Sequence, residues 1–305
     1  MTFLTARDIH FYLYSFAIEI GGVILLAAIL YADRKLREHG FKRSERNSSA
    51  AFRSREIPPW TENVSPLEYA RNLYRSMGLP STLFVADRTL KPESSSATWL
   101  GKVVVGKRGE SWPEMDGVPL YGVCQLNLEE AEYVPDCLQD FSLIAFFAIG
   151  DKKRPDFMMP GWAGRWEIRA YSKNDDLVPY EFPPWPHPYW KPCRARARSF
   201  TDHYRSGAAF LEDNNTSLPE FWVDVIDDYI REVLEPEFAR KQGLPNEAQW
   251  GTKLGGWPAP IQEDLGRPVA FQLGCENAAG INWVDGGCVY VWQKDGHWEV
   301  RSECY

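Results

Sequence analysis

Residue patterns that carry catalysis or bind metals are sparse in this sequence. It contains no H-E-x-x-H pair for a zinc ion, no Walker loop for a nucleotide and no G-x-S-x-G turn for a serine nucleophile. His187 and Cys193 lie six residues apart, which is no recognisable zinc spacing. Asp285 could act as a general base, but beside Gly286 and Gly287 it more simply caps a tight turn. We therefore predict no catalytic residue, no metal site and no cofactor.

Short clusters of acidic residues are the more informative pattern. Residues 1–60 hold nine of the 34 Lys and Arg and six of the 42 Asp and Glu, so residues 61–305 hold 25 and 36, a net charge of −11. Such clusters are ordinarily solvated, but this charge also speeds encounter with a basic partner. The predicted partner contacts are these acids and two tryptophans: Glu129, Glu130, Asp175, Asp176, Trp185, Trp190, Glu212, Asp213, Asp227 and Asp228.

Two further segments leave alternatives open. The run from Phe182 to Pro192 contains too many prolines for a helix or a central strand. It either packs over the core, the safer interpretation, or displays Trp185 and Trp190 to a partner as exposed anchors. The alternating residues Arg194, Arg196 and Arg198 would share one face of a strand, where they either bind an anion such as phosphate or are simply solvated.

Composition and overall charge narrow the class of protein. The chain has 305 residues, of which 44% are apolar and 25% charged, as in soluble globular domains. The net charge of −8 argues against a generic nucleic-acid binder, so we predict no direct nucleic-acid binding. Six cysteines occur without a C-x-x-C pair, and we expect them to be reduced and mostly buried.

The amino-terminal segment predicts a membrane anchor. Residues 11–32 are mostly apolar and about as long as a bilayer-spanning helix must be. The basic residues follow this run, which places the carboxy-terminal body in the cytoplasm by the positive-inside rule. We predict an anchoring helix in residues 1–39, a basic linker in 40–60 and a body in 61–305, in a single-pass protein of the inner membrane. The alternative is a buried or partner-bound helix.

The body alternates helix and strand patterns. Ser65, Pro66 and Glu68 predict a capped helix start, and a second start at Ser217 precedes an apolar stripe that Pro236 should end. Strand patterns cover residues 118–128, 143–149, 166–171, 269–273 and 288–292.

The body also contains an internal echo. Each half has a Trp-Pro pair, then a Gly-x-Pro turn, then an apolar strand with a glutamine, which is Gln125 in the first half and Gln272 in the second. We therefore predict a sheet-rich α+β domain with two related halves, preceded by one N-terminal apolar helix.

The same residues resemble those of a known family. The run Trp112-Pro113, Gly117-Val118-Pro119-Leu120 and Gln125-Leu126-Asn127-Leu128 resembles the first signature of the YwqG-like family. The run Lys253-Leu254-Gly255-Gly256-Trp257-Pro258-Ala259-Pro260-Ile261-Gln262 resembles its second, and Asn282-Trp283-Val284-Asp285-Gly286-Gly287 its close. The resemblance covers roughly residues 65–305 and implies a sheet-rich α+β domain without an established enzymatic activity.

The family's members are often encoded beside polymorphic toxins. The resemblance therefore implies an immunity protein that binds and neutralises a cognate toxin domain, which the acidic body predicts to be basic. The alternative hypothesis is an enzyme or ligand-binding domain with a pocket between the two halves, tethered to the membrane.

Overall fold

The computed structural model describes residues 64–91, 94–149, 165–181, 187–204, 220–244, 248–259, 261, 265 and 267–304. The predicted anchor at 11–32, the linker at 40–60 and the helix start at Ser217 lie outside these residues. No helix within the described ranges is long and apolar enough to cross a membrane.

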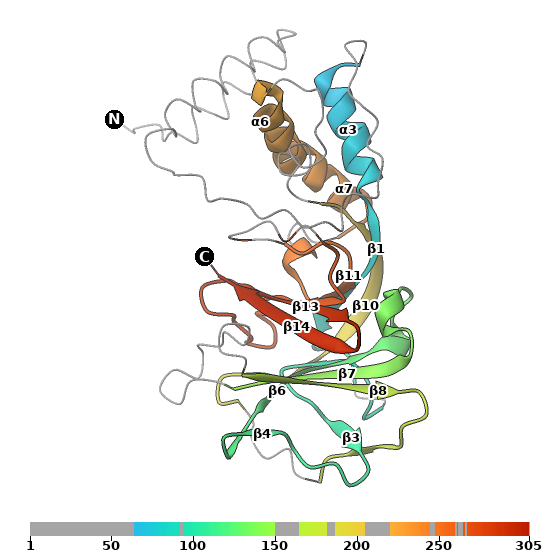
Figure 1. Ribbon diagram of the computed structural model, residues 1–305, viewed down its shortest axis with the longest axis vertical. Coiled ribbons are helices and arrows are strands. Elements are labelled where there is room, and N and C mark those ends of the chain that lie inside the picture. Colours follow the sequence, from blue (N-terminus) through green and yellow to red (C-terminus); the bar gives the residue numbers. More distant parts are fainter. Residues whose placement is uncertain are drawn as a thin grey trace, which may run out of the picture.

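Ten antiparallel strands form one sheet that curls into a nearly closed barrel (Figure 1). Their order is β14-β13-β12-β11-β1-β10-β2-β6-β7-β8. The strands are β1 (Leu79–Asp87), β2 (Trp99–Leu100), β6 (Tyr121–Asn127), β7 (Phe141–Ala148), β8 (Trp166–Ser172), β10 (Cys193–Asp202), β11 (Lys253–Gly255), β12 (Phe271–Leu273), β13 (Cys288–Lys294) and β14 (His297–Glu303). Two small sheets pair β3 (Val105–Lys107) with β9 (Leu177–Pro179) and β4 (Glu114–Met115) with β5 (Val118–Pro119). The expected strands are confirmed, although the one expected at 269–273 is confined to β12.

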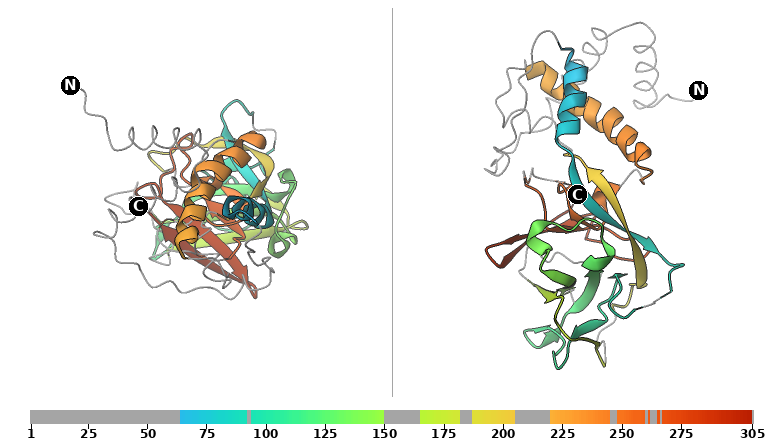
Figure 2. Two further views of the ribbon diagram at one scale, coloured as in Figure 1. Left: turned by 90° about the horizontal axis from the view of Figure 1, so that it is seen from above. Right: turned by 90° about the vertical axis from the view of Figure 1, so that its right-hand side faces the viewer.

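The helices lie together at one end of the molecule, where β1 and β10 extend away from the other strands (Figure 2). Helix α3 (Pro66–Ser76) begins as predicted, with the Ser65 hydroxyl accepting a hydrogen bond from the Glu68 N–H at 3.2 Å. Helix α6 (Glu220–Tyr229) continues through a π-helical segment (Ile230–Leu234) into helix α7 (Glu235–Lys241). The prediction that Pro236 ends the helix is wrong. Pro236 stands in the first turn of α7, where the missing N–H of a proline does not matter.

The core lies mainly inside the curled sheet. Its buried side chains come from both ends of the strand order, and they include Phe84, Leu126, Phe146, Phe271 and Trp283. A second cluster joins α3 to α6 and to the π-helical segment. Of the six cysteines, all free, three are buried, Cys275 and Cys304 are half-buried and Cys137 is exposed.

The glutamines of the two repeated motifs, Gln125 and Gln272, form similar hydrogen bonds to the backbone. Gln125 is fully buried on β6, where its Oε1 accepts from the N–H groups of Val104 (2.9 Å) and Val105 (3.1 Å). Its Nε2 donates to the carbonyls of Ser95 (2.9 Å) and Ala97 (2.7 Å). These four bonds tie the chain before and after β2 to β6.

Gln272 does the same on β12. Its Oε1 accepts from the Ala259 N–H at 2.9 Å, and its Nε2 donates to the Gly251 carbonyl at 3.0 Å. The neighbouring threonines match as well, since the hydroxyl of Thr98 accepts from the Asn127 N–H (3.0 Å) and that of Thr252 from the Gly274 N–H (3.3 Å). The glutamine in each strand therefore satisfies buried backbone groups that would otherwise lack a partner.

We predict that replacing either glutamine with leucine destabilises the body. Gln125→Leu should cost several kcal/mol, because it orphans two N–H and two carbonyl groups, each worth about 1–3 kcal/mol when buried and unpaired. Urea unfolding of the full chain measures both losses. Gln139→Leu is the matched control, since Gln139 is exposed; equal losses in all three variants would contradict this role.

Candidate functional site

The strongest concentration of exposed acids lies in residues 128–140, here named the acidic loop, which connects β6 to β7. It contains two 3-10 turns, Leu128–Glu130 and Asp136–Leu138, and no lysine or arginine. Its acids are Glu129, Glu130, Glu132, Asp136 and Asp140, and all but Glu130 are exposed. Within the described part of the chain, only Glu130 among them forms an ion pair, to Arg194 at 3.2 Å. The other four carboxylates are therefore available to a partner.

The acidic loop is held in place by contacts with the second half of the body. The buried Thr82 hydroxyl on β1 donates to the Tyr133 carbonyl (2.9 Å) and accepts from the Tyr133 N–H (3.3 Å). Gly255, at the end of β11, has a φ of 63°, and a Cβ there would lie 2.7 Å from the Tyr133 ring and 3.2 Å from Pro135. Because only glycine leaves room for this packing, the loop rests directly on the Gly255-Gly256 turn.

A buried ion pair between Lys253 and Asp202 holds the Gly255-Gly256 turn in place. The Lys253 ammonium donates to the Asp202 carboxylate at 2.6 Å, with side-chain exposures of 0% and 4%. Asp202 also accepts from the Trp257 N–H at 2.9 Å. Burial raises the pKa of Asp202, and the Lys253 ammonium with the Trp257 and His203 N–H groups opposes that rise. These bonds join β10, β11 and the turn that carries the acidic loop.

The other predicted contact residues do not gather with the loop. Asp175 and Asp176 form ion pairs with Lys107 (3.0 Å) and Arg108 (2.7 Å) beside the β3–β9 pair. Asp227 and Asp228 lie on α6 and pair with Arg231. Each of these acids is neutralised by a nearby lysine or arginine. The predicted acids therefore do not form one surface.

The tryptophan prediction is wrong in one respect. Trp190 was expected to be exposed if it anchors a partner, but it is 9% exposed and its ring stacks on His187 at 4.2 Å. The packed alternative therefore holds for this residue. Trp185, Glu212 and Asp213 lie outside the described residues.

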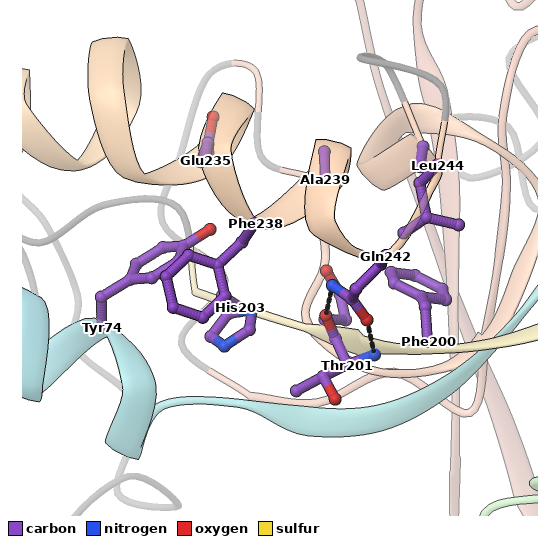
Figure 3. Close-up of a pocket in the computed structure, with 11 residues that line it drawn as sticks. Tyr74, Phe200, Thr201, His203, Glu235, Phe238, Ala239, Gln242 and Leu244 are labelled. Carbon is purple, nitrogen blue, oxygen red and sulfur yellow. Dashed lines mark hydrogen bonds between the residues drawn. The ribbon is translucent and has the colours of Figure 1, made fainter.

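A small pocket lies between α7 and the end of β10 (Figure 3). The Gln242 amide bonds both backbone groups of Thr201, at 2.6 and 3.0 Å, and His203 stacks on Tyr74 at 4.4 Å. Burial lowers the pKa of His203 to about 4, so this ring is neutral at pH 7. The cavity of about 30 Å³ is large enough to hold a water molecule. It lies beside the helices, whereas the alternative hypothesis placed a ligand pocket between the two halves.

Sequence analysis missed Asp202, Lys253 and the half-buried Glu276. Lys253 stands within a recognised motif, but an isolated Asp202 near the end of a strand gives no signal. Glu276 accepts from the Thr252 N–H at 3.1 Å, and burial raises its pKa to about 7. Such a carboxyl can exchange a proton near neutral pH. Burial also raises the pKa of the Cys288 thiol to about 12, so this cysteine remains protonated and unreactive at pH 7.

Among the described residues, no group of three or more His, Cys, Asp or Glu is arranged to hold a metal ion. Asp285 lies in the turn closed by the bond from the Gly287 N–H to the Trp283 carbonyl at 2.8 Å.

The strands and helices described above define a sheet-rich α+β domain. Residues 104–296 match a family described as a domain of unknown function, DUF1963. The match covers more than half of the 305 residues, and the chain belongs to this family. A search of the curated proteins finds no match to the chain.

We predict that Gly256→Ala destabilises the protein more than Gly296→Ala. Both glycines have a positive φ, 72° and 79°, so alanine is strained at each by about 1–2 kcal/mol. A Cβ at Gly256 would also overlap the Asp202 carboxylate, whereas nothing lies within 4 Å of one at Gly296. Breaking the buried ion pair should add about 3–5 kcal/mol. Chemical denaturation of both variants measures the difference, and equal losses would contradict the role assigned to the turn.

Proposed function

We propose that this protein binds and neutralises a basic partner protein through its acidic loop. The observation that carries the proposal is a set of four exposed carboxylates that pair with no described basic residue, on a loop that Thr82 and Gly255 hold in one conformation. A preorganised loop loses little conformational entropy on binding, which favours affinity. The net charge of −11 on residues 61–305 favours rapid encounter with a positively charged surface.

The particular partner we propose is a toxin domain, which makes the protein an immunity protein. This rests on the YwqG-like resemblance of the signature residues and on the charge of the body. Many toxins that act on nucleic acid are basic, and an acidic inhibitor presents to them the same charge as their substrate. The apolar run at 11–32 supports an inner-membrane location with the body in the cytoplasm.

The proposal predicts that reversing charges on the acidic loop slows association with the toxin that a neighbouring gene encodes. The double variant Glu129→Lys with Glu132→Lys should lower the association rate about tenfold or more at low salt, because four units of charge change at the contact. Glu114→Lys with Glu232→Lys is the matched control, since both acids are exposed and lie outside the loop. Surface plasmon resonance with the immobilised toxin measures the rates at two salt concentrations.

Co-expression in cells tests the immunity function and the acidic loop as its contact surface separately. The intact protein should protect cells from the toxin, and the loop variant should protect less well than the control variant. If cells die equally with and without the intact protein, the immunity function is wrong and the enzyme hypothesis gains weight. If the loop variant protects as fully as the control, the immunity function stands and the acidic loop is not its contact surface.

A further inference from the structure

Trp99 on β2 has a polar group that no other described residue satisfies. The residue is 9% exposed, and its indole N–H is buried and forms no hydrogen bond within the described ranges. A buried donor left unpaired costs about 1–3 kcal/mol, so native proteins seldom retain one without a reason. An unsatisfied donor of this kind is suited to a ligand that carries an acceptor.

Lys102 covers the same ring. Its ammonium lies 3.4 Å from the centroid of the Trp99 ring, and the residue is half-buried. Lys253, the other lysine that is not exposed among the described residues, has the Asp202 carboxylate at 2.6 Å. In the described part of the chain Lys102 forms no ion pair, and burial lowers its pKa. The cation is therefore partly desolvated without a counterion.

Arg194 completes the surroundings of Trp99. It lies directly opposite Trp99 in the β10–β2 register, with its guanidinium carbon 5.9 Å from the ring. Bonds to the Thr98 carbonyl (3.1 Å), the Lys91 carbonyl (3.1 Å) and Glu130 fix the guanidinium in place. Arg194 therefore adds positive potential beside Lys102 while it remains paired with the Glu130 carboxylate.

Basic residues outnumber acids at this end of β10, in a body that is otherwise acidic. The adjoining basic residues on β1, β10 and their flanking turns are Arg88, Lys91, Lys191 and Arg196. Among the described residues, the acids here are Asp87, paired with Arg196 at 3.0 Å, Glu130, paired with Arg194, and Glu276, whose charge acts on Cys193. This local positive charge is the second observation that favours an anion.

We propose that Trp99 and Lys102 form a binding site for a phosphate group, with Arg194 as its fixed positive neighbour. Phosphate oxygens can accept from the Lys102 ammonium and from the indole N–H together, and lysine is a common phosphate ligand as a point charge. Of the three alternating arginines, only Arg194 takes part, because Arg196 pairs with Asp87 and Arg198 donates to the Gln242 carbonyl at 2.7 Å. The site adjoins the acidic loop, whose Glu130 pairs with Arg194 and accepts from the Thr98 N–H at 3.2 Å, but it does not depend on the proposed function.

Nuclear magnetic resonance of the full-length chain, labelled with nitrogen-15 at its tryptophan indoles, tests this site. The signal missing from Trp99→Phe identifies the Trp99 indole N–H. Inorganic phosphate, added at constant ionic strength, should shift that signal saturably. Glycerol 3-phosphate, the soluble part of a phospholipid headgroup, forms the second arm. A shift with both ligands supports a site open to phosphate esters, and a shift with inorganic phosphate alone supports a site for the free ion.

Lys102→Gln should raise the apparent Kd for phosphate at least about tenfold, because a charge-assisted hydrogen bond is lost. Lys102→Arg should retain binding, and Lys294→Gln, at the exposed end of β13, is the matched control. If the glutamine variant fails to fold, the arginine variant and the wild-type titration still decide. The proposal is overturned if the Trp99 signal does not move with either phosphate compound. It is also overturned if acetate moves the signal equally or if Lys102→Gln binds as the wild type does.

Discussion

The ion pair between Lys253 and Asp202 is the interaction on which the rest of the body depends. Asp202 ends the long central strand β10, and Lys253 begins β11, the first strand of the second half. Through the Trp257 N–H the same carboxylate fixes the segment after the Gly255-Gly256 turn. The Trp257 indole then donates to the Met77 carbonyl at 2.7 Å, which links the turn to the end of α3. One buried carboxylate thus joins both halves of the sheet to the helical end.

The acidic loop inherits its position from this arrangement. Tyr133 and Pro135 pack on Gly255, so the loop from the first half rests on the turn that the ion pair holds in the second half. A loop supported in this way presents its carboxylates in one geometry. The phosphate site that we infer adjoins the loop at the start of β10, where Arg194 pairs with Glu130.

Local patterns predicted much of the fold. Ser65, Pro66 and Glu68 are neighbours in sequence, and most of the strands follow apolar runs. The start of α3 and most of the strands could therefore be predicted from one sequence. The matched glutamines were also visible, as an echo between halves. The Lys253–Asp202 pair was not, because its members are 51 residues apart and neither local pattern requires the other. The prediction that Pro236 ends the helix was wrong because a π-helical segment allows a proline to begin a new helix within a continuous run.

The candidate site was predictable only in part. Acid clusters are visible in sequence, but whether an acid is already paired depends on the fold. Asp175 and Asp176 lie opposite Lys107 and Arg108 because β3 and β9 pair, a contact between residues far apart in the chain. Trp190 is buried because His187, three residues earlier, stacks on it. Among the predicted acids that the structure describes, only Glu129 is exposed and forms no ion pair with another described residue.

Unfolding of Lys253→Met, alone and with Asp202→Asn, tests the central role of the ion pair most directly. The single variant leaves a buried carboxylate uncompensated and should lose about 3–5 kcal/mol of stability in one cooperative transition. The double variant should lose less, because a neutral asparagine oxygen still accepts from the Trp257 N–H. A loss below about 1 kcal/mol for Lys253→Met, or a double variant less stable than the single one, would contradict the account.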